Sequence, residues 1–420
     1  MRIAQHIVRA QDAVSRCQSL ARFTEDPPRI CRTFLSPPMH ACHRQIEEWM
    51  QPLGMSVTVD AAGNLRGLYP GTDVGARRVL IGSHLDTVPD AGTLDGILGV
   101  MIAISLIESL QGRHLPFAVE VIAFSEEEGV RFGVPFIGSR ALVGRLDGEL
   151  LLRRDSNGVS VHEAILSYGL NPSEIPAAVL QEGVRGYIEF HIEQGPVLEH
   201  RHLPLGIVES IAGQTRMELV FSGVANHAGT TPMRLRRDAL VAAAEWAVAV
   251  EKGALESPGL VATVGALKAN PGAANVVAGE CCATLDVRHA LDTVRTQSVG
   301  GFLQTAEAIA KRRGISLTST IKLVQAATPM NSLLLNEIEI AVSKAGITPY
   351  RMVSGAGHDA MILAEKVPSA MIFIRSPSGI SHNPKESVLV EDVAKAIECG
   401  LHLLDQLAVS HDFQMRTHRA

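Results

Sequence analysis

The sequence has few cysteines, few aromatic residues and no long apolar run. Its six cysteines among 420 residues form no C-x-x-C pair and no regular framework. We therefore expect reduced thiols and a cytoplasmic protein, not a disulfide-stabilised secreted one. No window approaches the ~20 apolar residues of a membrane helix, and residues 1–23 lack the apolar core of a signal peptide. Neither membrane insertion nor secretion is predicted.

Positive charge is also scarce. The 38 Lys and Arg residues are outnumbered by 44 Asp and Glu residues, and the basic residues do not gather into a stripe. This balance argues against nucleic acid or an anionic membrane as the main partner. The hydrophobic fraction of 46% and the charged fraction of 20% are ordinary for a globular protein. A chain of this length is expected to form two or three folding units.

Strand-like and helix-like segments alternate in the first half of the chain. Residues 79–83 (VLIGS) and 117–125 (FAVEVIAFS) are predicted to be buried strands, and residues 96–110 between them a buried helix. Residues 186–191 and 205–211 continue the strand pattern. Such alternation predicts an α/β fold whose mixed sheet is mostly parallel and flanked by helices.

The pattern then changes. Strands that alternate polar and apolar residues, such as RMELVFS, are accompanied by long helical patterns at residues 235–255 and 291–313. We predict an inserted α+β sandwich over residues 212–328, with a four-stranded antiparallel sheet and two helices. Residues 1–211 and 329–420 would together form a discontinuous catalytic domain, because insertions at surface loops are well tolerated.

Histidine and acidic side chains stand at the ends of four predicted strands. The set comprises His84, Asp86, Asp95, Glu126, Glu127, Glu128, His191 and His382. In open α/β sheets, ligands bind beyond the carboxyl ends of the strands, so these side chains are expected to meet. Adjacent carboxylates repel one another unless cations neutralise them. Nitrogen and oxygen ligands without thiolates suit Zn²⁺, Mn²⁺, Co²⁺ or Ni²⁺, and the pattern therefore predicts a metal site.

Each feature alone has a simpler interpretation. His84 and Asp86 are a chance pair in a loop, Asp95 is a helix N-cap, or the three glutamates are a solvated acidic turn. The combination of four strand ends, with no competing set of cysteines, favours the metal site over these alternatives.

Six blocks in order, within about residues 55–390, resemble a known family. They read GSHLDTVPDAGTLDGILGV, SEEEGVRF, FHIEQGPVLE, ANHAGTTPMRLRRDA, SGAGHDA and ISHNPKE. They are similar to the di-metal hydrolases of the aminoacylase/carboxypeptidase type, and more narrowly to N-carbamoyl-L-amino-acid hydrolases, β-ureidopropionases and allantoate amidohydrolases. The resemblance implies cleavage of the carbamoyl C–N bond of a small ureido acid, with release of ammonia and CO₂.

The resemblance also implies a site for two divalent metal ions per subunit. One ion would be held by His84, Asp95 and His191, and the other by Asp95, Glu128 and His382, with Asp95 bridging. Zn²⁺ is the first expectation, with Mn²⁺, Co²⁺ or Ni²⁺ as alternatives.

Further roles follow from the same resemblance. Asp86 would orient His84, and Glu127 would be the general base, although the third glutamate leaves Glu126 as an alternative. Gln194 and Gly357 match positions near the substrate.

Three residues of the predicted insertion match family positions that complete the active site. They are His227, which would stabilise the oxyanion, Asn275, which would bind the ureido group, and Arg288, which would bind the substrate carboxylate. In the family such residues reach the active site of a partner subunit, so the resemblance implies a homodimer with shared active sites and a domain that closes over the site as a lid.

Rival functions stay open at this point. The motifs do not separate allantoate from an N-carbamoyl-L-amino acid or N-carbamoyl-β-alanine, although residues 24–50 favour allantoate slightly. A peptidase or aminoacylase of the same superfamily is the alternative enzyme, and a metal-free binding protein with the same fold is the alternative outside catalysis. Arg375, where many relatives carry an apolar residue, is expected to affect specificity.

Overall fold

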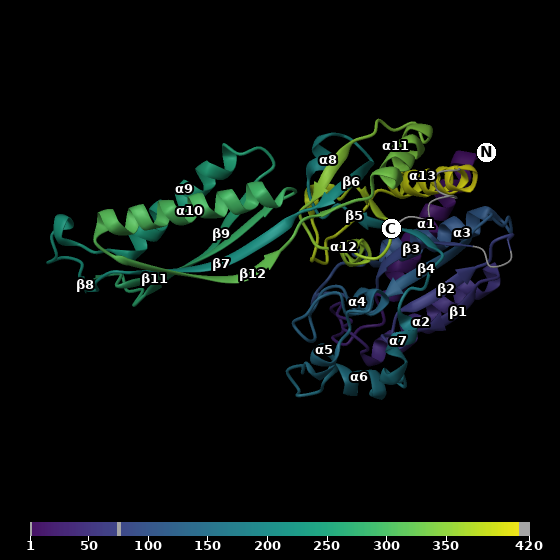
Figure 1. The fold of residues 1–420 in the computed structure, drawn as a ribbon, viewed down its shortest axis with the longest axis horizontal. Coiled ribbons are helices and arrows are strands. Elements are labelled where there is room, and N and C mark those ends of the chain that lie inside the picture. Colours follow the sequence, from purple (N-terminus) through teal and green to yellow (C-terminus); the bar gives the residue numbers. More distant parts are fainter. Residues whose placement is uncertain (1, 74–76, 411–420) are drawn as a thin grey trace. The chain divides into compact units, whose positions relative to one another are not determined.

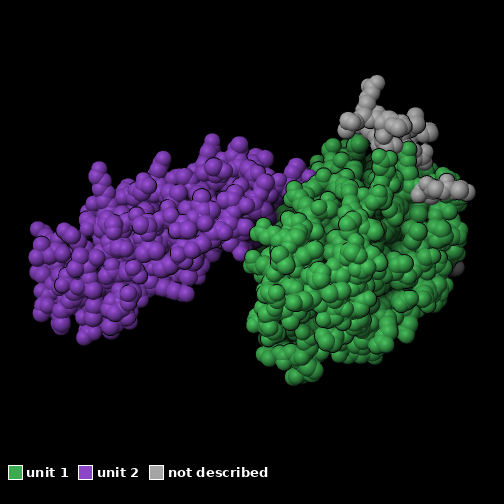
Figure 2. Space-filling model, turned by 60° about the horizontal axis from the view of Figure 1, so that its bottom comes forward, with its two compact units in different colours: residues 1–209, 330–352, 358–420 green, residues 210–329, 353–357 purple. Residues whose placement is uncertain are grey.

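The chain of this computed structural model, which describes residues 2–73 and 77–410, divides into two compact units (Figure 2). Unit 1 comprises residues Met1–Glu209, Met330–Met352 and His358–Ala420, and unit 2 comprises Ser210–Pro329 and Val353–Gly357. In the described ranges, no helix combines the length and the hydropathy that crossing a bilayer requires.

The larger sheet is mixed, with parallel pairing at its centre (Figure 1). Its strand order is β1-β2-β4-β3-β5-β15-β6-β13, and β14 also pairs with β6. The parallel pairs join β3 (Arg78–His84) to β4 (Ala118–Phe124), and β5 (Val184–Ile192) to both β3 and β15 (Ser369–Ile374). The other strands are β1 (Ser56–Val59), β2 (Leu65–Tyr69), β6 (Leu205–Ile211), β13 (Thr328–Pro329) and β14 (Arg351–Ser354). This architecture confirms the predicted α/β class.

Helices bury the central strands. Helix α3 (Ile97–Leu110) packs on β3 and β5, and α1 (Arg2–Leu20) and α13 (Val390–Val409) pack against it in turn. Because α3 lies between strands and helices, all of its residues except Ser109 are buried. A Cβ at Gly99 would lie 2.1 Å from the carbonyl oxygen of Phe190, so glycine lets this helix approach β5 closely.

The remaining helices of unit 1 are shorter or lie at its periphery. They are α2 (Pro37–Met50), α4 (Ile137–Val143), α5 (Gly148–Leu152), α6 (Val161–Ser167), α7 (Ile175–Ala178), α8 (Val197–His200), α11 (Ser332–Lys344) and α12 (Asp359–Leu363). Short 3₁₀ turns occur at Gln51–Leu53, Pro172–Glu174 and Pro377–Gly379. Helix α12 packs on β5 and β15, next to α4.

Unit 2 is built on a four-stranded antiparallel sheet, as predicted. The strand order is β12 (Ser316–Gln325), β7 (Gly213–Ser222), β11 (Glu280–His289) and β9 (Val261–Asn270). Helices α9 (Ala239–Leu255) and α10 (Asp292–Arg313) lie along one face (Figure 1). Their shared core holds the fully buried Trp246, whose indole N–H donates to the carbonyl of Phe302 at 2.9 Å. A 3₁₀ turn at Met233–Leu235 precedes α9, and β8 (Asn226–His227) pairs with β10 (Val276–Val277).

Candidate metal centre

The ends of three parallel strands bring the candidate ligands together. His84 is the last residue of β3, and His191 lies one residue before the end of β5. Glu127 and Glu128 follow β4 after a short turn, and Asp95 stands just before α3. Because β3, β4 and β5 run in parallel, their carboxyl ends share one edge of the sheet.

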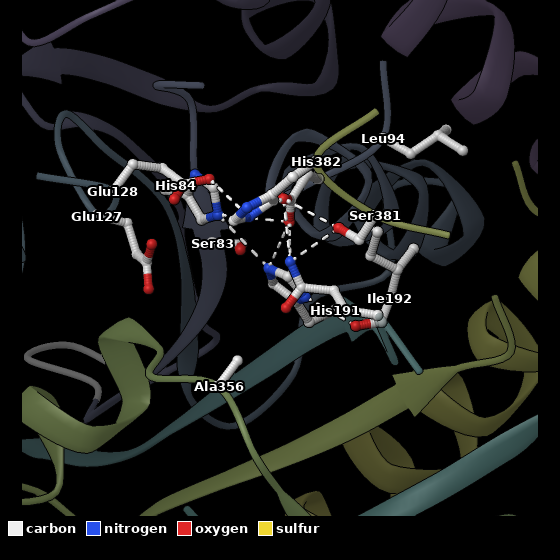
Figure 3. A network of polar contacts seen from close by, with 12 residues as sticks. Ser83, His84, Leu94, Glu127, Glu128, His191, Ile192, Ala356, Ser381 and His382 are labelled. Atoms are coloured by element: carbon white, nitrogen blue, oxygen red, sulfur yellow. Dashed lines mark hydrogen bonds and ion pairs between the residues drawn. The ribbon is translucent and has the colours of Figure 1, made fainter. Parts of the chain in front are cut away.

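His84, Asp95 and His191 form one compact group. One ligand atom of each lies within 4.8 Å of the others. The Nε2 atom of His191 is 3.3 Å from Asp95 Oδ1, and the Nε2 atom of His84 is 3.9 Å from the same oxygen. The two histidine Nε2 atoms are 3.4 Å apart. Figure 3 shows the rings of His84, His191 and His382 converging from separate segments.

Asp95, Glu128 and His382 form a second group. The Nε2 atom of His382 is 3.2 Å from Asp95 Oδ2 and 3.4 Å from Glu128 Oε1. One oxygen of Asp95 therefore faces the first group, and its other oxygen faces the second. A carboxylate placed in this way is suited to bridge two cations.

The hydrogen bonds of the two buried histidines fit metal binding. The Nδ1 atom of His84 lies 3.0 Å from the carbonyl oxygen of Asp86, and that of His191 lies 2.9 Å from the carbonyl oxygen of Ile192. A carbonyl oxygen only accepts, so each Nδ1 carries a proton and donates it. When both rings are neutral, each Nε2 carries a lone pair, and the two Nε2 atoms lie 3.9 and 3.3 Å from Oδ1 of Asp95. Such close lone pairs and carboxylates suit a cation between them.

The side chains around the site have shifted pKa values. Burial raises the pKa of Glu127 and of Glu128, although nearby histidines oppose the shift. Burial lowers the pKa of His191 to about 4. For Asp95, the hydrogen bond with His382 and the charges of His191 and His84 outweigh burial and hold the pKa below its ordinary value.

Asp86 contacts both the first histidine and the acidic triplet. Its carboxylate oxygen lies 3.4 Å from Nδ1 of His84. Its two oxygens also accept the backbone N–H groups of Glu127 at 2.9 Å and Glu128 at 3.1 Å. Asp86 thus holds the backbone of the two glutamates in addition to contacting the histidine that it was predicted to orient.

The structure separates Glu126 from Glu127. Glu126 is fully buried, and its carboxylate accepts the backbone N–H of Gly129. Glu127, in contrast, forms a candidate metal-binding group with His84 and Glu128. Of the described residues, Glu126 enters none of the four such groups, so the geometry favours Glu127 as the residue that faces the centre.

Sequence reasoning missed Glu386, which lies beside Asp95. Its Oε1 atom accepts the backbone N–H groups of Leu94 and Asp95. Burial raises its pKa to about 7, and the charge of Asp95 adds to the shift. The one signal for it was its place at the end of the ISHNPKE block, four residues after His382.

Gln194 was predicted to lie near the substrate. The structure places its side-chain amide on the Asp95 carboxylate, with Nε2 at 3.1 and 3.0 Å from the two oxygens of Asp95 and 3.0 Å from Ser381 Oγ. Gln194 and His382 both have left-handed backbone, with φ of 57° and 52°. Such conformations are uncommon outside glycine and often occur at functional sites.

A second buried polar layer was also missed. Glu189 accepts the hydroxyl of Ser83 at 3.1 Å and the backbone N–H of Ala360 at 2.9 Å. With His191 and His358 it forms another group whose geometry suits a metal ion. Burial raises the pKa of Glu189 to about 7. These side chains link the strand that carries His84 to the start of α12.

The predicted residues of the insertion all lie in unit 2. Nδ1 of His227 accepts the backbone N–H groups of Gly229 at 3.1 Å and Thr230 at 3.2 Å. A nitrogen that accepts carries no proton, so a neutral His227 presents its Nε2–H as a donor. The backbone carbonyl of Asn275 accepts the N–H of Ala228, next to this histidine.

Arg288 is held by its own unit. Its Nε and Nη2 atoms donate to the two oxygens of Asp286, both at 2.9 Å, and its Nη1 donates to the carbonyl of Gly355 at 2.6 Å. Gly355 and Gly357 belong to the short segment Val353–Gly357 that joins unit 2.

Arg375 is engaged away from the candidate ligands. Its Nε and Nη2 atoms each donate to one oxygen of Asp392 at 2.8 Å, in the first turn of α13. These contacts show that Arg375 ties the end of β15 to the start of α13. They give no support to the expected effect on specificity.

Comparison with known proteins agrees with the motifs. The model of peptidase family M20/M25/M40 matches residues 80–406. An N-carbamoyl-L-amino acid amidohydrolase of Geobacillus stearothermophilus is 40% identical over 86% of this chain and 90% of that protein. A probable allantoate deiminase of Oryza sativa subsp. japonica is 38% identical over 95% of this chain and 88% of that protein. The crystal structure of a hydantoinase/carbamoylase family amidase from Burkholderia multivorans has a TM-score of 0.90 and 30% identity, covering 96% of this chain and 98% of that chain.

Proposed function

Because the chain belongs to peptidase family M20/M25/M40, we propose that it is a metal-dependent amidohydrolase that cleaves the carbamoyl C–N bond of a small ureido acid. Its relatives over most of the chain are named as amidohydrolases and deiminases, and it is a hydrolase of linear C–N bonds. The observation that carries the proposal is the position of Asp95, whose two oxygens face two separate ligand groups.

The proposed centre holds two divalent ions per subunit. His84, Asp95 and His191 would hold one ion, and Asp95, Glu128 and His382 would hold the other. Nitrogen and oxygen donors without thiolate suit Zn²⁺ first, and Mn²⁺, Co²⁺ or Ni²⁺ as alternatives. When bound, such a pair supplies Lewis acidity and makes water a nucleophile at neutral pH.

Glu127 handles the proton in the proposed reaction. Its carboxylate takes a proton from the attacking water and later delivers it to the leaving nitrogen, as a general base and then a general acid. Attack on the carbonyl carbon and cleavage of its bond to the R–NH nitrogen give R–NH₂ and carbamic acid, which breaks down to CO₂ and ammonia. The sum is R–NH–CO–NH₂ + H₂O → R–NH₂ + CO₂ + NH₃. The carboxylate of Asp86 accepts the backbone N–H of Glu127, with an N···O distance of 2.9 Å, and so holds Glu127 in place.

The residues of the insertion are proposed to bind the substrate. The Nε2–H of His227 donates to the oxygen on which charge develops, and the guanidinium of Arg288 binds the substrate carboxylate. Asn275 and Gln194 bind the ureido group, beside the backbone at Gly357. Asp286 accepts from Nε and Nη2 of Arg288, and Gly355 accepts from Nη1. The remaining N–H groups on Nη1 and Nη2 are therefore the ones proposed to meet the substrate.

A substrate panel tests the proposed function. Purified protein is given allantoate, N-carbamoyl-L-amino acids and N-carbamoyl-β-alanine, and ammonia is measured. N-acetyl-amino acids and dipeptides form the comparison set, and for these the released amino acid is measured, because their hydrolysis yields no ammonia. We expect ammonia release from at least one ureido acid, with allantoate as the first candidate, and slower cleavage of the comparison set. Preferred cleavage of N-acetyl-amino acids or dipeptides would instead support an aminoacylase or peptidase.

All six thiols are free, which fits the proposed cytoplasmic location.

We further propose a homodimer in which unit 2 of one subunit, acting as a lid, completes the site of the other. Mixing inactive Glu127→Gln with inactive Arg288→Ala, under conditions that exchange subunits, is then expected to restore activity. In a random mixture, half of the dimers are mixed and each has one intact site, so about a quarter of the sites recover. Activity is measured before and after exchange.

The matched control mixes Glu127→Gln with Asp95→Asn. Both changes lie in unit 1, so every site keeps one lesion and no recovery is expected. If Glu127→Gln and Arg288→Ala show no recovery although subunit exchange is demonstrated, each site is contained within one chain.

A further inference from the structure

The loop that carries Asp95 is anchored by a carboxylate from a distant part of the chain. Oε1 of Glu386 accepts two consecutive backbone N–H groups, those of Leu94 at 2.9 Å and Asp95 at 3.0 Å. Glu386 is 7% exposed, so its hydrogen bonds are largely protected from competition with water. These two bonds fix the backbone from which the Asp95 side chain extends toward both ligand groups.

The same carboxylate also reaches the loop that carries His382. Its Oε2 atom lies 3.3 Å from the hydroxyl of Ser381, and that hydroxyl lies 3.4 Å from Oδ2 of Asp95. Ser381 directly precedes His382, and Figure 3 shows Ser381 beside the converging histidines. Glu386 therefore joins the segment that provides Asp95 to the segment that provides His382, and both of these residues belong to the second ligand group.

The fit between the two segments is close. A Cβ at Gly92 would lie 2.5 Å from both Cβ and Oε1 of Glu386. Atoms cannot approach to that distance, so a side chain at position 92 would push Glu386 away from the backbone N–H groups that it accepts. Glycine at this position leaves the space that the carboxylate occupies.

We propose that Glu386 is a positioning residue of the metal centre. It holds the backbone of Asp95 so that each oxygen of this carboxylate faces the other ligands of one group, and it keeps the segment of His382 beside Asp95. This inference rests on the proposed function. Glu386 belongs to none of the four candidate ligand groups among the described residues. Its bonds to Leu94 and Asp95 involve backbone N–H groups, so they leave both oxygens of Asp95 available to cations.

The test measures metal affinity in four variants of the full-length protein. Glu386→Ala removes the acceptor, Glu386→Gln keeps an oxygen acceptor without the charge, and Gly92→Ala displaces Glu386 without changing it. Asp60→Ala is the matched control, because the side chain of Asp60 is also only 8% exposed and accepts two backbone N–H groups, those of Ala62 and Asn64, both at 3.0 Å. Each metal-depleted protein is titrated with Zn²⁺ and with Mn²⁺ by calorimetry, and its thermal unfolding is recorded.

We expect Glu386→Ala to weaken binding of at least one ion by about 10–100-fold, the usual effect of removing a partner that orients a ligand. Gly92→Ala is expected to weaken it in the same direction, whereas Glu386→Gln stays within about threefold of the unchanged protein because its amide oxygen still accepts. Asp60→Ala is expected to keep the metal affinity even where its melting temperature falls.

Two results would overturn the inference. One is that Glu386→Ala and Gly92→Ala bind two ions as tightly as the unchanged protein. The other is that Asp60→Ala loses as much affinity as Glu386→Ala, since the effect would then follow general stability. If the unchanged protein itself binds no divalent ion, the proposed function fails as well, and this outcome is distinguishable from the first two.

Discussion

Glu127→Gln is expected to lower kcat by a factor on the order of 10²–10⁴ while the protein keeps its metal ions. The amide has nearly the shape of the carboxylate, but it cannot take a proton from water or return one to the leaving nitrogen. Glu127 is not one of the five residues proposed to hold the ions, so metal content should stay unchanged. The measurement is the rate of ammonia release from the preferred ureido acid, together with metal analysis of the same sample.

Glu126→Gln is the matched control for this experiment. Glu126 is fully buried, and its oxygen accepts the N–H of Gly129, a contact that a glutamine oxygen can keep. We expect turnover close to that of the unchanged enzyme. The reverse pattern, with Glu126→Gln inactive and Glu127→Gln active, would mean that the base has been assigned one residue too late in the acidic triplet.

Asp95→Asn is expected to reduce ammonia release to background and metal content to at most about one ion per chain. Asp95 is the residue common to both ligand groups, and an amide lacks the charge and the second oxygen donor that a bridge between two cations requires. Metal content and activity should therefore fall together.

Asp90→Asn provides the comparison for the loss of a carboxylate from the same loop. Asp90 is exposed and has left-handed backbone with φ of 58°, a conformation that asparagine tolerates. This variant should keep its metal ions and its rate. If Asp95→Asn retains two ions and substantial activity, Asp95 is not the bridge.

Elements that are buried on both sides were predictable from the sequence. Strand β4 and helix α3 are almost wholly buried, so their sequences are apolar apart from a few polar residues, and this marks them clearly. Strand β12 (SLTSTIKLVQ) is mostly exposed at the edge of the sheet of unit 2 and was not located, because its alternation is too weak. Residues 1–23 were considered only for their lack of a signal-peptide core. Arg9 and Arg16 in this segment are half-buried on α1 and pair with Glu108 of α3, a long-range contact that no local pattern marks.

The site shows the same division between local and long-range information. The strand-end residues could be proposed from the sequence because parallel strands bring their carboxyl ends together and because six blocks resemble a known family. The contact of Glu386 with Leu94 spans 292 positions, and no local pattern marks a carboxylate whose partners are backbone N–H groups. The pairing of Arg375 with Asp392 likewise depends on how α13 packs. The sequence therefore showed an arginine where many relatives carry an apolar residue, but not the aspartate that it pairs with.

Metal removal and return tests the claim of a two-ion hydrolase most directly. The protein is depleted with a chelator, its residual metal is measured, and ammonia release from the preferred ureido acid is followed as Zn²⁺ or Mn²⁺ is added back. We expect negligible release from the depleted protein and a rise that levels off at about two ions per chain. Full activity in protein shown to contain no metal would contradict the proposed function.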